Sequence, residues 1–174
     1  RNIKLESNVY SDDTLHVVSS NIKINNFEAN FCNGDCIDFD YVNGTLSNIS
    51  LNIAGNDGLD FMSSNVHIDN YSINKCKDKG ISIGESSKVT ASNIKINECL
   101  LGIAAKDNSI GLFEDVSISN AELGVSSYKK NWRYGRPGYI LIEKKIYKNN
   151  IIDEKLELMP EKKEIENFFE KQYL

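Results

Sequence analysis

The chain of 174 residues contains only two prolines, two histidines and one tryptophan, and it lacks several familiar signatures. No apolar run approaches the ~20 residues of a membrane-spanning helix, and we expect neither a membrane span nor a secretory leader. No P-loop, Ser-His-Asp order or pair of metal-ligand histidines occurs. A net charge of −5 argues against nucleic acid as a partner. These absences exclude several common membrane, nucleotide-binding and hydrolase classes.

The four cysteines do not match the ligand spacing of a zinc site. Three of them share a periodic column with two alanines, which comprises Cys32, Ala54, Cys76, Cys99 and Ala121. A column shared with alanine predicts small, buried side chains stacked in a turn, and it favours free thiols over a disulfide. Free thiols would also allow a cytoplasmic location.

A 22-residue repeat organises most of the chain. Its central apolar column consists of Leu15, Ile37, Leu59, Ile81, Ile103 and Val125. A second, mostly apolar column follows two places later, and a column rich in glycine precedes it by one place. Within each unit, apolar residues alternate in short runs, which is the period of strands and not of helices. The pattern predicts a solenoid whose units bury one face against their neighbours.

Stacking the units predicts an all-β fold of three parallel sheets, with three short strands per unit and equivalent strands about 4.8 Å apart. A further column precedes the third strand and comprises Asn26, Asn48, Asn70, Asn93 and Asp115. Asparagine tolerates the left-handed backbone of a tight corner, and its amide can bond to stacked copies. The spacing, this ladder and the glycine column resemble the right-handed parallel β-helix of the pectate-lyase-like superfamily.

The resemblance covers roughly residues 13–127 and implies a polysaccharide-binding or polysaccharide-processing module at the cell surface or outside the cell. We expect the β-helix to span residues 1–159, with regular coils over 13–127. A basic, aromatic insertion at 128–138 breaks the period, and a last irregular coil follows at 139–159. Residues 160–174 carry an apolar stripe, which predicts an amphipathic helix that caps the open end of the solenoid.

The chain opens on a strand-like stretch without an initiator methionine. We therefore expect it to be the C-terminal part of a larger protein, with an upstream domain as a partner within the same polypeptide. This gives the alternative function, in which the β-helix is a non-catalytic scaffold and the catalytic domain lies upstream.

The outer face of the first strand is predicted to be acidic in the first three coils. Its polar residues are Asp13, His16, Asp35, Asp38, Asp40, Asp57 and Asp60. Stacked carboxylates about 4.8 Å apart repel one another, so a proton, a cation or water must offset them. Asp57 has an evident partner in Lys79 one coil later, whereas Asp38 and Asp60 have only His16 at the end of their column.

Three interpretations of this face stay open. Asp35, Asp38, Asp57 and Asp60 could bind Ca²⁺, which prefers several oxygen ligands, and no other cofactor is required. Asp38 and Asp60, with His16, could form the catalytic group of a glycoside hydrolase or polysaccharide lyase, with two carboxylates as acid and base or nucleophile. Alternatively, the acids form a solvated face that keeps the rod soluble.

The insertion is the second candidate site, with Lys129, Trp132, Arg133, Tyr134 and Arg136 as predicted substrate-binding residues together with Lys79. Aromatic rings stack on sugar faces, and the cations suit carboxylate, sulfate or phosphate groups. The alternative is that the rings fold back over the side of the coil. Nearby, Glu85 and Asp107 share an outer column beside Lys106, and we expect exposed ion pairs there worth under about 1 kcal/mol.

Overall fold

The computed structural model describes residues 2–143 and 145–148. The described part is all β, without any helix, and its strands are β1 (Ile3–Leu5), β2 (Leu15–Val18), β3 (Asn21–Cys32), β4 (Ile37–Asp40), β5 (Asn43–Ala54), β6 (Leu59–Met62), β7 (Asn65–Gly84), β8 (Lys88–Asn97), β9 (Cys99–Lys106), β10 (Ile110–Ser119), β11 (Leu123–Tyr128), β12 (Tyr139–Ile142) and β13 (Lys145–Lys148). The described residues form no helix that is long and apolar enough to cross a membrane. The predicted capping helix at 160–174 and the end of the last coil lie outside the described residues.

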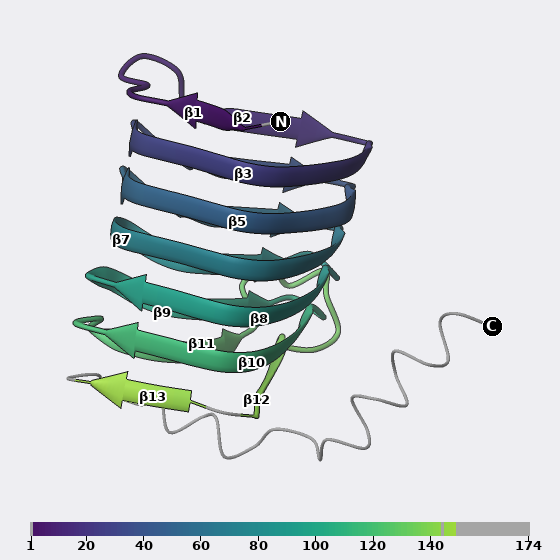
Figure 1. Cartoon of the computed structure of the whole chain (residues 1–174). Coiled ribbons are helices and arrows are strands. Elements are labelled where there is room, and N and C mark those ends of the chain that lie inside the picture. Colours follow the sequence, from purple (N-terminus) through teal and green to yellow (C-terminus); the bar gives the residue numbers. More distant parts are fainter. Residues whose placement is uncertain (1, 144, 149–174) are drawn as a thin grey trace.

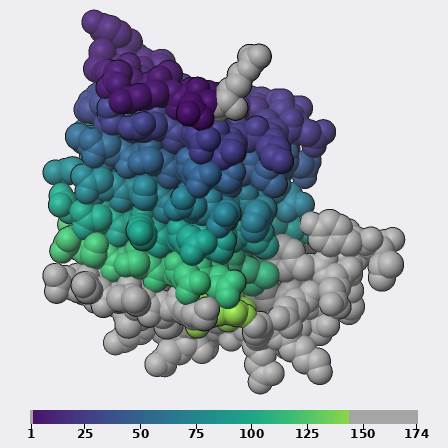
Figure 2. Space-filling view, viewed as in Figure 1, coloured from purple at the N-terminus to yellow at the C-terminus, as the bar shows by residue number. Residues whose placement is uncertain are grey.

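All strand pairs are parallel, and they stack successive coils directly on one another (Figure 1). The first sheet contains β2, β4, β6, the end of β7, β9 and β11, and its pairing joins the six residues of the central apolar column in order. Figure 2 shows the described coils as successive bands of colour, from purple at the N-terminal coil to green. The predicted parallel solenoid is therefore confirmed.

The second and third sheets differ from the expected pairs of short strands, because one bent strand crosses both of them in most coils. β3 and β5 each run for 12 residues through the corner. The corner residues Asn26, Asn48 and Asn70 have φ of 59°, 53° and 60°, which confirms the predicted left-handed backbone. The Asn70 amide donates to Asn48 Oδ1 at 2.7 Å, whereas the Asn48 amide donates to Asn25. A single left-handed residue thus turns the chain without ending the strand.

The core lies inside the solenoid and is built from the repeated apolar columns. Ile37, Phe39, Leu59 and Phe61 have no exposed surface, and the two phenylalanine rings meet edge to face with their centroids 5.8 Å apart. Residues of the first coil, such as Leu15, are only partly buried because no equivalent coil covers them among the described residues. Burial therefore grows from the N-terminal coil inward.

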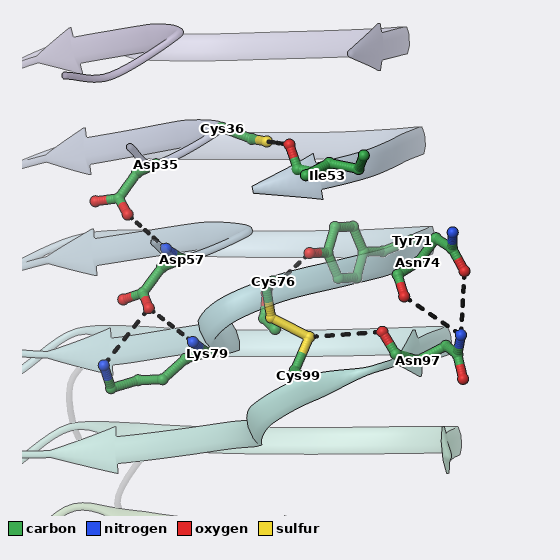
Figure 3. The surroundings of a disulfide bond; sticks show 11 residues. Asp35, Cys36, Ile53, Asp57, Tyr71, Asn74, Cys76, Lys79, Asn97 and Cys99 are labelled. Atoms are coloured by element: carbon green, nitrogen blue, oxygen red, sulfur yellow. Dashed lines mark hydrogen bonds and ion pairs between the residues drawn. A yellow bond between two sulfur atoms is a disulfide. The ribbon is translucent and has the colours of Figure 1, made fainter. Parts of the chain in front are cut away.

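The cysteine column is buried as predicted, but the prediction of free thiols is wrong. Cys76 and Cys99 occupy paired positions of adjacent coils and form a disulfide, with their Cα atoms 4.6 Å apart (Figure 3). Cys32 and Cys36 form a second disulfide within one corner. In-register stacking explains the first bond, since it brings equivalent Cα atoms into the range that a disulfide spans.

We expect the disulfide between coils to contribute about 3 kcal/mol to the free energy of unfolding, as its loop of 23 residues suggests. The double variant Cys76→Ala/Cys99→Ala should lower the urea midpoint by more than Cys32→Ala/Cys36→Ala does, since the second pair closes a loop of only four. Urea titration of both variants, with and without reductant, measures the difference. Four titratable thiols in the unreduced wild-type protein would contradict both bonds.

Candidate functional site

Two of the predicted calcium ligands, Asp35 and Asp57, lie buried at the corner before the first sheet, with 9% and 2% of their surface exposed. Asp35 Oδ1 accepts the backbone N–H of Asp57 at 2.7 Å, and Asp57 Oδ1 accepts that of Lys79 at 2.8 Å (Figure 3). The expected outward orientation is wrong for both residues, because corner N–H groups require acceptors that the strand ladder does not provide. These carboxylates connect one coil to the next.

The predicted pairing of Asp57 with Lys79 is confirmed. Lys79 Nζ lies 3.5 Å from Asp57 Oδ1 and also contacts Asp78. Burial raises the pKa of Asp57 to about 7, although the nearby lysine charge opposes the shift. Lys79 is therefore held at the corner by two carboxylates.

The acids of the first coils that stay open to solvent gather around His16. Its Nε2 lies 3.2 Å from Asp40 Oδ2 and 3.4 Å from Asp38 Oδ2. The hydrogen bond to Asp40 raises the pKa of His16. Burial, followed by the charges of Asp40 and Asp60, raises the pKa of Asp38 to about 7. Near neutral pH, this cluster holds protons that isolated carboxyls would have lost.

Three of these residues could in principle hold a metal. In the part of the chain that the structure describes, the ligand atoms of Asp13, His16 and Asp38 lie within 4.8 Å of one another. Of these three residues, only Asp38 is one of the calcium ligands expected from the sequence. Two other expected ligands, Asp35 and Asp57, accept hydrogen bonds from the corner backbone instead. A ring nitrogen beside carboxylates suits a transition metal better than Ca²⁺.

Asp60 has a cationic partner that the sequence reasoning missed. Lys106 Nζ lies 3.9 Å from Asp60 Oδ1 and donates a 2.8 Å hydrogen bond to Ser82 Oγ. The lysine reaches back across Gly84, where a Cβ would lie 3.3 Å from Lys106 Cε. The expectation of an exposed Lys106 is wrong, since only 4% of its surface is accessible. The glycine in its outer column was the signal that could have revealed this reach.

The outer face of the first sheet is covered from the fourth coil onward. Ser82 and Ala104 are fully buried there, and Ser126 is nearly so. Gly138, at the end of the segment between β11 and β12, lies so close to the backbone of Ala105 that a side chain there would collide. The outward-facing acids of the first three coils therefore lie on the half of the first sheet's outer face that stays open to solvent.

That segment, the basic loop (residues 129–138), is fixed at both ends by the corner after β9. Asp107 Oδ1 accepts the backbone N–H groups of Lys130 and Asn131, both at 2.8 Å. Asn108 Oδ1 accepts the N–H of Arg136 at 2.9 Å, and the Asn108 N–H donates to the Arg136 carbonyl at 3.1 Å. The sequence reasoning did not assign Asp107 and Asn108 this role, and the expectation of an exposed Asp107 is wrong.

The basic loop presents its tryptophan to solvent, so this ring does not fold back over the coil. Trp132 is 82% exposed, and the Arg133 guanidinium lies 5.8 Å from its ring centroid. Arg136 lies 5.9 Å from the ring of Tyr139. Lys129 is exposed and Tyr134 is half-buried. Trp132 and Arg133 therefore present an aromatic ring and a cation side by side on the exposed loop.

Lys79 lies apart from the arginines but adjoins the start of the loop. A groove of about 670 Å³ contains Lys79, Tyr128 and Lys130, with Leu100, Leu101, Leu123, Asp78 and Glu122 as further lining. The structure thus brings Lys79 together with the beginning of the insertion, while the catalytic candidates His16, Asp38 and Asp60 lie on the open part of the first sheet.

The stacked parallel coils and their Asn corners define a β-solenoid protein. Residues 13–154 match the family model for the right-handed β-helix region, and this match covers well over half of the chain. The chain therefore belongs to the right-handed β-helix family, which confirms the predicted right-handed parallel β-helix. No curated protein and no solved structure matches the chain significantly.

The raised pKa of Asp38 predicts a pH-dependent stability. An unfolded aspartate titrates near ~4 and the folded Asp38 near 7, so the fold loses stability as the pH rises between these values. We expect Asp38→Asn to be more stable than wild type at pH 8, on the order of 1–2 kcal/mol, and equal to it near pH 4. Thermal unfolding at both pH values tests this.

Asp69→Asn is the matched control for this experiment. Hydrogen bonds from Asn93 and Ser92 lower the pKa of Asp69, so its effect has the opposite sign. A gain in stability for both variants would show that any surface charge removal is stabilising, and a gain for neither would contradict the titration of Asp38.

Proposed function

We propose that this β-helix binds an anionic polysaccharide through its basic loop. The observation that carries the proposal is Trp132, a large aromatic side chain that is 82% exposed on a loop fixed at both ends. Binding residues often lie on loops that a rigid scaffold holds in place. A fixed loop also loses little conformational entropy when it binds a partner.

The charged neighbours of Trp132 support an anionic partner. Arg133 and Arg136 carry guanidinium groups, which recognise carboxylate or sulfate with two parallel hydrogen bonds. Lys129 adds a further exposed cation on the same loop. The indole supplies the apolar surface that a sugar face needs, and the cations supply the attraction to acidic substituents.

The two disulfides support a location where such polymers occur. Structural disulfides persist in secreted and cell-surface proteins, whereas the cytosol keeps thiols reduced. We therefore infer an oxidising, extracellular or cell-surface compartment for this domain.

The only tryptophan of the chain is a direct reporter of the proposed contact. Titration with a uronic-acid polymer or a sulfated polymer should change the emission of Trp132 in a saturable way, and added salt should weaken the effect by screening. A neutral polymer should give a much smaller change. Fluorescence titration at two salt concentrations measures this.

Variants of the loop separate this contact from nonspecific binding. By calorimetry, Trp132→Ala and Arg133→Gln should each lower affinity about tenfold, which equals about 1.4 kcal/mol. Lys95→Gln removes an exposed cation of β8, which is outside the loop, and should leave the affinity for the polymer unchanged. Equal losses for all three would indicate bulk charge attraction, and an unresponsive Trp132 would favour the scaffold function.

A second candidate function is cleavage of the polymer by Asp38 and Asp60. These residues pair in adjacent strands, and their surroundings differ, since Asp38 has a pKa of about 7 and Asp60 lies beside Lys106. A carboxyl that keeps its proton near neutral pH can serve as the acid, and a second carboxyl group nearby can serve as base or nucleophile. His16, hydrogen-bonded in the same cluster, would position Asp38.

If the pair is catalytic, a polymer that wild type cleaves should be turned over at least 100-fold more slowly by Asp38→Asn and by Asp60→Asn. Each substitution removes one proton-transfer or nucleophilic role. Loop binding measured with Trp132 should stay unchanged in both variants. Reducing-end assays measure cleavage, and unaltered turnover in either variant would contradict catalysis by this pair.

A further inference from the structure

The Asp107 carboxylate has one oxygen without a partner, although the side chain is fully buried. Its Oδ1 accepts two backbone N–H groups of the basic loop, whereas Oδ2 has no hydrogen-bond partner among the described residues. A buried polar atom left unbonded costs about 1–3 kcal/mol, and more when it is charged. Such an atom in a folded protein calls for a bound water or ion.

Glu85 occupies the same outer column one coil earlier. Ser82 pairs with Ala104 and Ile83 with Ala105, and the same register places the backbone of Glu85 beside that of Asp107. The Ser86 N–H donates to the Asp107 carbonyl at 2.8 Å. Equivalent backbone positions of adjacent coils are about 4.8 Å apart, so the Glu85 and Asp107 side chains start from stacked positions. Burial raises the pKa of Glu85, the charge of Lys106 opposes this shift, and the charges of Asp60 and Asp107 add to it.

None of the ion pairs among the described residues includes Glu85 or Asp107. Lys106 is close in sequence, but its Nζ bonds to Ser82 and faces Asp60. Lys130 is exposed, so water solvates most of its charge. Two acids, one of them fully buried, therefore share a corner in which no lysine forms an ion pair with them, although the charges of Lys106 and Lys130 act on Glu85 from a greater distance.

We propose that Glu85 and Asp107 hold a divalent cation of the Ca²⁺ class beneath the basic loop. Asp107 Oδ2 and the Glu85 carboxylate supply hard oxygen ligands, which Ca²⁺ accepts in irregular geometry together with water. The ion would satisfy the buried oxygen while Oδ1 continues to fix the loop. The site is distinct from the cluster around His16, and it does not depend on what the loop binds.

Terbium is a suitable probe because it replaces Ca²⁺ and luminesces when a nearby aromatic ring transfers energy to it. Trp132 and Tyr134 belong to the basic loop, which lies over the proposed site. Excitation of the aromatic side chains of the protein should therefore give a saturable terbium emission that added Ca²⁺ abolishes by competition. Ca²⁺ should also raise the Tm, because it binds the folded state. Asp107→Asn should weaken terbium binding at least tenfold, since it keeps an oxygen acceptor for the loop but removes the charge.

Glu85→Gln is the second variant, and it should weaken binding as well without touching the loop contacts. Asp38→Asn is the control and should leave the signal unchanged. Circular dichroism verifies that each variant is folded. Absence of a terbium signal in wild type would overturn the proposal and assign the buried oxygen to water. A signal lost in Asp38→Asn but kept in Asp107→Asn and Glu85→Gln would overturn it too, by placing the ion at His16.

Discussion

In-register parallel hydrogen bonding between successive coils is the interaction on which the rest of the structure depends. It places chemically equivalent positions one above another, so each column of the sequence becomes a physical row of the molecule. Apolar rows such as Ile37, Leu59 and Ile81 form the core without long-range packing of unlike elements. The left-handed asparagine corners allow the same turn in every coil, and the stacked register aligns Cys76 with Cys99.

The same register also stacks like charges, and the chain offsets them differently from coil to coil. At the corner, Asp35 and Asp57 direct their charge toward backbone N–H groups of the next coil. On the open face, His16 lies beside Asp38, and Lys106 reaches back over a glycine to Asp60. Repulsion is thus relieved by a local hydrogen bond, by a neighbour in the stack or by a cation from two coils away.

The basic loop divides the face of the first sheet into an open acidic part and a covered part. Asp107 and Asn108 fix its two ends, so its exposed indole and guanidinium groups are presented on an ordered segment. Burial of Asp107 is a consequence of this arrangement, because the loop that it anchors also shields it from water. The position of Asp107 under the loop therefore explains both the anchoring of the loop and the unsatisfied oxygen. The proposed glycan surface and the proposed ion site lie close together for this reason, but they use different chemical groups.

The sequence by itself determined the features that repeat, namely the solenoid, its core columns and the left-handed corners, because a parallel stack converts periodicity directly into position. It also identified the Asp57–Lys79 pair, which joins neighbouring coils at equivalent places. Only the tertiary structure decided the contacts that break the period. Whether two buried thiols bond depends on a distance of a few ångströms, the reach of Lys106 to Asp60 depends on the space above Gly84, and the burial of Asp107 depends on where an irregular loop folds. The columns show which residues start one above another, as for Cys76 and Cys99 or Gly84 and Lys106, but the side-chain paths and the fold of a segment outside the repeat are decided only in three dimensions.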